Sequence, residues 1–168
     1  GGINKYETSQ YQLAWQNNIN FDYGSLVLLY DYLKEEIDTT STSFSKDDRD
    51  NNGFVIAYNT QYEQHTLQTS LREDINSQYD NETTGSIGYA YQINKQWKVS
   101  SSFGTAFVAP TFDYLYYPGT NNPNLKPEGI NYLDFSLLGS NETERLNWSL
   151  TAFAYTVDNA ISQTDTPN

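Results

Sequence analysis

Apolar side chains recur at every second position in one segment of this chain after another. In residues 86–93, for example, Ile87, Tyr89 and Tyr91 alternate with glycine, alanine and glutamine. A period of two is that of a β-strand with two unlike faces, and helical periodicity is nearly absent. The residues of the second face are small or polar and include few Lys or Glu. This face could therefore line a water-filled barrel interior at least as well as it could form the surface of a soluble protein. The pattern predicts an all-β fold.

The alternating segments predict about eight antiparallel strands with up-and-down connectivity. We expect them at 5–16, 24–37, 52–62, 65–76, 83–93, 97–107, 129–139 and 145–156, with a bulge near Thr151, where the alternation changes phase. The connections 17–23, 63–64, 94–96 and 140–144 are shorter, whereas 38–51, 77–82 and 108–128 are mostly longer. Short turns that alternate with longer loops are typical of transmembrane β-barrels, and so are aromatic residues near strand ends, such as Trp15, Tyr62 and Trp97.

Composition excludes several classes of protein. The chain has 168 residues, a net charge of −12, no cysteine and a mean hydropathy of −0.70. The acidic balance argues against nucleic-acid partners, and the absence of cysteine removes thiol-ligated metal sites. No apolar run approaches the roughly 18 residues of a membrane helix. No signal peptide is visible, so we expect a mature chain or a piece cut from a longer one, with residues 1–168 as a single unit.

The stretch from Ser100 to Glu128 carries the most specific motif. A Ser-, Gly- and Phe-rich strand leads into Ala-Pro, then an aromatic loop, then Asn-Pro-Asn-Leu-x-Pro-Glu. This pattern resembles TonB-dependent outer-membrane receptors, and the order of further segments is most similar to the vitamin B12 receptors of that family. The matching motif residues are Gly104, Ala109, Pro110, Asn122, Pro123, Asn124, Leu125, Pro127 and Glu128.

The resemblance implies a section of a nutrient-import barrel in the outer membrane of a Gram-negative bacterium. Such receptors have a barrel of about 22 strands around a plug. We expect no plug within these 168 residues, because the strands leave no room for one. TonB would then act through a plug that is not part of this chain. The implied partners are outer-membrane lipid and a small ligand such as cobalamin or an iron-siderophore. No cofactor and no enzymatic activity are implied. The strands would either close into a narrow eight-stranded barrel or associate through the first and last strands.

Two sets of loop residues are candidate sites. Tyr114, Tyr116 and Tyr117 offer aromatic faces that could stack on a macrocycle or a siderophore, or else pack within their own loop. Asp48, Asp50 and Asn52 match the first half of an EF-hand loop, but the twelfth position is Asn59 instead of Glu, which leaves only a weak calcium option. The single histidine, His65, lies in a predicted tight turn without a marked catalytic partner.

A soluble β-sandwich that binds carbohydrate or another ligand is the rival interpretation, because sandwich strands alternate in the same way. The two interpretations differ in what covers the apolar face. In a membrane barrel, Leu13, Ile56, Leu71, Ile87, Tyr89 and Val99 would face lipid, whereas in a sandwich they would lie inside.

Overall fold

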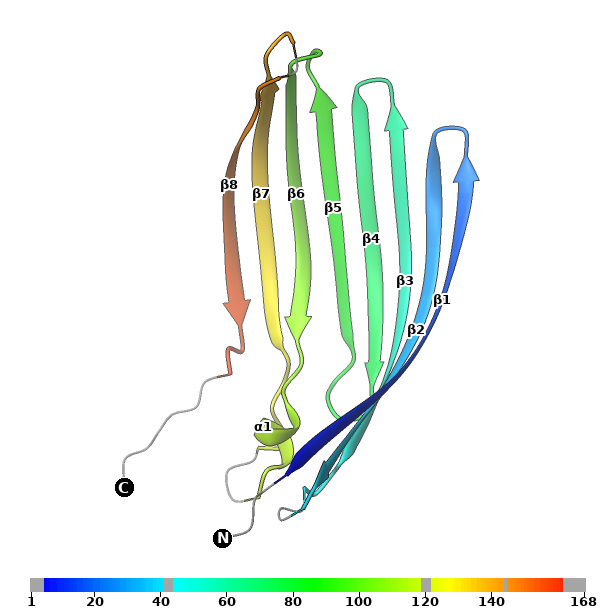
Figure 1. Ribbon diagram of the computed structural model, residues 1–168, viewed down its shortest axis with the longest axis vertical. Coiled ribbons are helices and arrows are strands. Elements are labelled where there is room, and N and C mark those ends of the chain that lie inside the picture. The colour runs from blue at the N-terminus through cyan, green and yellow to red at the C-terminus, as the bar shows by residue number, and fades with distance from the viewer. Residues whose placement is uncertain (1–4, 41–43, 119–121, 144, 162–168) are drawn as a thin grey trace, which may run out of the picture.

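A computed structural model describes residues 5–40, 44–118, 122–143 and 145–161. It contains one antiparallel sheet in which the eight strands are adjacent in sequence order (Figure 1). The elements are β1 (Tyr6–Phe21), β2 (Gly24–Thr39), β3 (Asp48–Tyr62), β4 (His65–Asn76), β5 (Glu82–Gln92), β6 (Trp97–Val108), α1 (Phe112–Tyr116), β7 (Glu128–Ser140) and β8 (Asn147–Asp158). The predicted all-β, up-and-down architecture is confirmed. No helix among the described residues has the length and apolar character needed to cross a membrane.

The strand boundaries differ from the predicted ones mainly in the first two hairpins. Residues 17–21 continue β1, so the first turn consists only of residues 22 and 23, and β3 begins at Asp48, within the predicted 38–51 loop. Asn and Asp, which dominate these two segments, are poor strand formers in isolation. Pairing with β2 supplies their backbone hydrogen bonds, and this tertiary effect outweighs the local preference. Trp15 consequently lies inside β1, opposite Tyr30, and not beside a turn.

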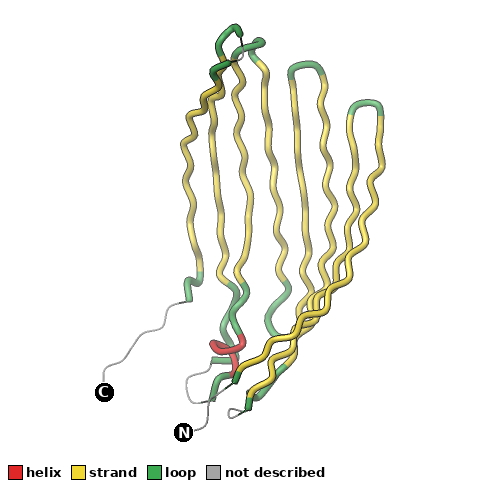
Figure 2. The backbone as a smooth tube through the Cα atoms, in the orientation of Figure 1, coloured by secondary structure: helices red, strands yellow, loops and turns green. Residues whose placement is uncertain are grey.

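The connections alternate between the two ends of the sheet, as Figure 2 shows, and the two longest lie at the same end. Turns 22–23, 63–64, 93–96 and 141–146 lie at one end, and 40–47, 77–81 and 109–127 lie at the other, together with α1. We call the second end the loop end. Aromatic rings pair near the turns, with centroids 5.5 Å apart for Tyr23 and Tyr62 and 5.1 Å apart for Trp97 and Trp148.

Every strand pair keeps one register along its whole length. Because cross-strand partners share a face, the registers place Leu13, Ile56, Leu71, Ile87, Tyr89 and Val99 on one face, as predicted. Gly88 and Ala90 lie on the opposite, polar face. The apolar face is open: Leu13 is 63% exposed and Leu71 54%. A β-sandwich would cover this face with a second sheet, and the described residues form only one sheet.

The two edges of the sheet, β1 and β8, do not contact each other within the described residues. The eight strands therefore form an open wall and not the narrow closed barrel that was one of the two expected arrangements. The predicted bulge near Thr151 is wrong, because β7 and β8 pair without interruption from Gly129–Asp158 to Ser140–Asn147. The phase change instead places Trp148 and Leu150 on the apolar face and Phe153 and Tyr155 on the other.

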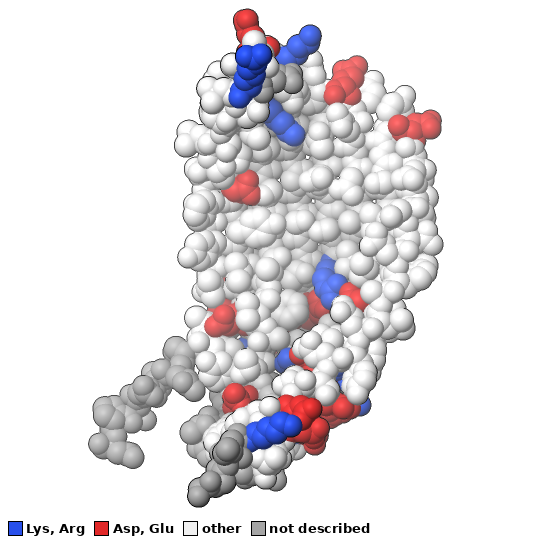
Figure 3. All heavy atoms as spheres, viewed as in Figure 1, with Lys and Arg blue, Asp and Glu red and all other residues white. Residues whose placement is uncertain are grey.

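Charge is distributed unevenly over the wall. In Figure 3, charged side chains gather toward the two ends of the visible face, and acidic ones predominate at the loop end. Fewer charged side chains lie between the two ends of this face.

Arginine scanning of adjacent positions tests the assignment of the faces. Ile87→Arg places a charge on the apolar face, and we expect it to lower the stability of the membrane-inserted state by about 2–4 kcal/mol if it lies near the midplane. Gly88→Arg, one residue away, projects to the polar face and should leave insertion nearly intact. Urea titration of the protein folded into lipid vesicles measures both effects, and equal losses would contradict the assignment.

Candidate functional site at the loop end

Residues 109–118 and 122–127, the described part of the connection between β6 and β7, fold into a compact unit around the short helix α1. Thr111 caps the helix, with its hydroxyl oxygen accepting a bond from the Tyr114 backbone N–H at 3.4 Å. Phe112, Leu115 and Tyr116 are buried, and Leu115 is inaccessible to solvent. These three form the hydrophobic cluster of the described chain, because both faces of the sheet remain uncovered. The connection is therefore a packed structure and not an extended loop.

The motif residues 122–128 form the turn that leads from this connection into β7. The Leu125 N–H donates to the Asn122 carbonyl at 3.2 Å, and the Asn122 side chain accepts from the Asn124 N–H at 3.1 Å. Pro123 occupies the second position of this turn, where its fixed φ is favourable. Pro127 is buried, and Glu128 then pairs with Val108 as β7 begins. The Asn-Pro-Asn-Leu-x-Pro-Glu sequence thus builds a turn and a strand start. The strands end at Val108 and resume at Glu128, within one residue of the prediction.

The motif glycine Gly104 has a packing role. It lies opposite Tyr132 on the polar face of the sheet, and a Cβ at this position would come within 2.5 Å of the Tyr132 hydroxyl. Only glycine allows the tyrosine ring to lie across this strand.

The neighbouring β2–β3 hairpin holds the unit in place. Ile37 and Phe44 pack against the buried cluster together with Leu125. The Phe44 and Tyr117 rings meet edge to face with centroids 6.0 Å apart, and the Lys46 ammonium lies 5.8 Å from the centre of the Tyr116 ring. Segments about seventy positions apart in the sequence therefore form one surface at the loop end.

Arg49 connects the two segments by three different interactions. It forms an ion pair with Glu35 at 2.6 Å, and both side chains are largely shielded from water. It also donates to the Pro110 carbonyl at 3.0 Å, and its guanidinium lies 4.9 Å from the centre of the Phe112 ring. A planar guanidinium serves all three partners at once, which a lysine ammonium cannot do.

A second charged cluster lies on the polar face below this unit, and we call it the arginine bridge. Arg72 on β4 donates to both oxygens of Asp31 on β2, at 2.7 and 3.1 Å, and to both oxygens of Asp74, at 2.7 Å each. The Asn51 amide also donates to Asp74 at 2.7 Å. Asp74 is only 2% exposed, so its negative charge must be stabilised by these hydrogen-bond partners in place of water.

The arginine bridge spans β3 because β3 has a glycine at that point. Gly53 lies between Asp31 and Asp74 in the cross-strand row, and a Cβ there would overlap Arg72 Nη2 and come within 2.7 Å of Asp31 Oδ2. Any larger residue must displace a guanidinium that four hydrogen bonds hold.

Replacement of this glycine tests the bridge. We expect Gly53→Ala to destabilise the folded protein by about 1–3 kcal/mol, because the guanidinium must move and leave Asp74 poorly paired. Gly88→Ala is the matched control, because its Cβ would meet only Ser102 Cβ at an ordinary 3.6 Å. Urea unfolding of both variants measures the difference. Equal stabilities would show that the bridge does not depend on Gly53.

The connection 77–81 completes the loop end. The Tyr79 ring lies 6.3 Å from the Phe107 ring, centroid to centroid, and burial raises the pKa of its hydroxyl above the ordinary value. Tyr79 is therefore a neutral, half-buried hydrogen-bonding group beside the charged clusters.

The three candidate tyrosines have unequal environments. Tyr116 is 4% exposed and belongs to the buried cluster, so in this conformation it packs the loop. Tyr117 is half-buried against Phe44, and Tyr114 on α1 is also half-buried. Of the three, only Tyr114 and Tyr117 have ring surface available to an incoming molecule.

The acidic residues of the weak calcium option lie on a strand. Asp48, Asp50 and Asn52 follow one another at alternate positions of β3, and Asp50 and Asn52 accept hydrogen bonds from the Tyr32 and Tyr30 hydroxyls at 2.5 and 2.9 Å. Ladder pairing with β2 extends this segment, so the compact loop of an EF-hand is not formed. Within the described ranges, no three His, Cys, Asp or Glu side chains converge on a common metal position.

Sequence reasoning did not identify Arg49 or the arginine bridge as clusters. The charged residues themselves are plain in the sequence, at alternate positions of the strands that became β2, β3 and β4. Their pairing could not be read without the registers, because partners such as Asp31 and Arg72 are 41 positions apart.

Comparison with known proteins agrees with this architecture. The family model described as TonB dependent receptor-like, beta-barrel matches residues 2–168. The vitamin B12 transporter BtuB of Photobacterium profundum is 32% identical over 159 residues, which are 94% of this chain and 26% of that protein. BtuB of Vibrio cholerae serotype O1 is 31% identical over 79% of this chain and 21% of its own length.

Solved structures share the fold at lower identity. The siderophore receptor PirA of Acinetobacter baumannii has a TM-score of 0.76 and 16% identity over 92% of this chain and 27% of its own. The copper transporter OprC has a TM-score of 0.76 and 16% identity over 92% of this chain and 30% of its own. The chain thus spans about a quarter of the length of the curated relatives that it matches. These relatives are transporters and receptors and not enzymes, and the chain belongs to the TonB-dependent receptor-like β-barrel family of the Gram-negative outer membrane.

Proposed function

We propose that the chain is one section of the wall of an outer-membrane receptor that imports vitamin B12. The observation that carries this proposal is the 32% identity with a vitamin B12 transporter over 94% of the chain. The siderophore receptors share the fold at 16% identity, which carries no information about the ligand.

The remaining parts of such a receptor are proposals as well. An exposed strand edge presents unpaired backbone groups, and these groups must be paired where the strand crosses hydrocarbon. We infer that β1 and β8 pair with further strands of the same barrel. A plug outside residues 1–168 would close the lumen and would transmit the energy that TonB supplies.

The electrostatics of the loop end favour a ligand without net negative charge. The exposed acidic residues at this end include Asp47, Asp48, Asp80 and Asp113, whereas Lys46 and Lys126 are among the few basic ones. A field of one sign attracts or repels a charged ligand before contact. Ferric catecholate siderophores are anionic, so this surface would oppose their approach. A corrin macrocycle such as cobalamin meets no comparable barrier.

Tyr114 and Tyr117 would provide aromatic contacts for the corrin. We expect Tyr114→Ser together with Tyr117→Ser to weaken cyanocobalamin binding by roughly twofold to tenfold per ring, the factor that one aromatic contact contributes. Equilibrium binding of cyanocobalamin to the receptor that contains this chain measures the effect. Tyr116 should be left intact, because its removal would unpack the loop core.

Tyr62→Ser is the matched control, because Tyr62 is 55% exposed and ends β3 beside the 63–64 turn, at the opposite end of the sheet. An unchanged affinity in the double variant would remove the two tyrosines from the site. Failure of the unaltered receptor to bind cyanocobalamin, together with tight binding of a ferric siderophore, would overturn the proposed ligand.

A further inference from the structure

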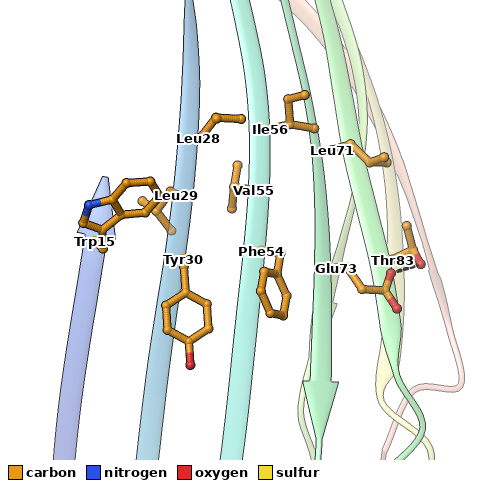
Figure 4. A pocket seen from close by; sticks show the side chains of 10 residues that line it. All are labelled: Trp15, Leu28, Leu29, Tyr30, Phe54, Val55, Ile56, Leu71, Glu73 and Thr83. Carbon is orange, nitrogen blue, oxygen red and sulfur yellow. Dashed lines mark hydrogen bonds between the residues drawn. The ribbon is translucent and has the colours of Figure 1, made fainter. Parts of the chain in front are cut away.

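The polar face of β1 carries a row of uncharged side-chain amides. Ala14 lies in the same cross-strand row as Asp31 and Gly53, so the even-numbered positions of β1 share the polar face. The opposite, apolar face of the same strands is seen in Figure 4, where Trp15 of β1 lies in a row with Tyr30 of β2. The exposed amides on the polar side, which we call the amide track, are Gln10, Gln12, Gln16, Asn18 and Asn20.

The amide track runs along the strand from the loop end to the turn end. Gln10 donates to the Glu35 carboxylate at 2.8 Å, beside the Arg49 ion pair, and Asn20 lies just before the 22–23 turn. At about 3.4 Å per residue the track is roughly 34 Å long, similar to the thickness of the hydrocarbon core, about 30 Å. Near the turns the row continues across the sheet to Asn59 and Gln68.

The middle of the track offers both hydrogen-bonding groups and aliphatic surface. The Gln16 amide donates to Asn18 Oδ1 at 2.9 Å. A primary amide has two donor hydrogens and an acceptor oxygen, so this bond uses only part of what the two side chains can form. Leu29 and Val27 lie opposite Gln16 and Asn18 on β2 and border the track with apolar side chains.

We propose that the amide track is the path along which the wall guides a neutral, amide-bearing macrocycle through the lumen. This inference rests on the proposed import of cobalamin, whose corrin ring carries carboxamide arms and methyl groups around its rim. A carboxamide donates and accepts, so it pairs reciprocally with Gln or Asn. The methyl groups fit the aliphatic border of Leu29 and Val27.

Amides suit a path better than charged groups do. A neutral hydrogen bond that replaces one to water contributes only about 0.5–1.5 kcal/mol, whereas one to a charged group contributes about 1.5–3 kcal/mol. A solute moves through a pore when its successive sites are each weak enough to leave, as in ion channels. Similar amides along β1 provide such a series, and an anionic siderophore would find no cationic partner among them.

Uptake of labelled cyanocobalamin by cells that carry the complete receptor tests the proposal. We expect Asn18→Leu, which removes an amide at nearly constant size, to lower the uptake rate at saturating ligand roughly fivefold. This is the factor that one neutral hydrogen bond contributes. The rate is normalised to the number of surface binding sites, which corrects for folding. The dissociation constant should not change, because the initial binding contacts lie at the loop end. Asn18→Gln keeps an amide and should keep the uptake rate.

The adjacent residue supplies the matched control. Asn17→Leu makes the same change on the apolar face, opposite Leu28, and should leave uptake unaltered. Equal rates for the two leucine variants, or a weaker dissociation constant with an unchanged rate, would overturn the amide track. Entry of vancomycin into the Asn18→Leu cells would also overturn it, because the amides would then hold a plug in place. Failure of the unaltered receptor to bind cyanocobalamin would instead overturn the proposed function, so the two failures are distinguishable.

Discussion

The uninterrupted pairing register of the sheet determines the other features of this wall. Each of the seven strand pairs keeps a single register from end to end, so alternate residues stay on the same face across all eight strands. A shift of one residue in any pair would turn the apolar side chains of one strand toward the lumen. Within hydrocarbon the ladder also pairs backbone groups that water cannot reach.

The same register concentrates charge where it can be neutralised. Asp31, Gly53 and Asp74 form one cross-strand row on the polar face, and Arg72 reaches across the glycine to both carboxylates. Above this row, Arg49 and Glu35 tie the hairpin to the 109–127 unit. The loop end is thus held by buried charge pairs and a small apolar cluster, while the rest of the wall relies on the ladder and on its lipid surroundings.

The sequence predicts this fold well because the period-two pattern is strong and the turns are short. The six residues expected on the lipid side share one face, and the 109–127 connection begins and ends within one residue of the prediction. The end of β1 and the start of β3 were missed, because polar residues such as Asn18 and Asp50 become strand only through pairing. The phase change in β8 does not form the predicted bulge, because the uninterrupted pairing with β7 keeps one register and only moves Phe153 and Tyr155 to the polar face. The arginine bridge and the burial of Tyr116 depend on contacts between distant segments, which periodicity does not reveal.

The central claim is that the two faces of the sheet meet different solvents, and labelling of single cysteines tests it most directly. The chain has no cysteine, so each substitution introduces a unique label site. Cysteines at positions 86–91 of β5, in the membrane-inserted receptor, would be treated with a membrane-impermeant maleimide. We predict that positions 86, 88 and 90 react, whereas 87, 89 and 91 stay protected until detergent is added. Equal reactivity at all six positions would contradict a wall between water and lipid.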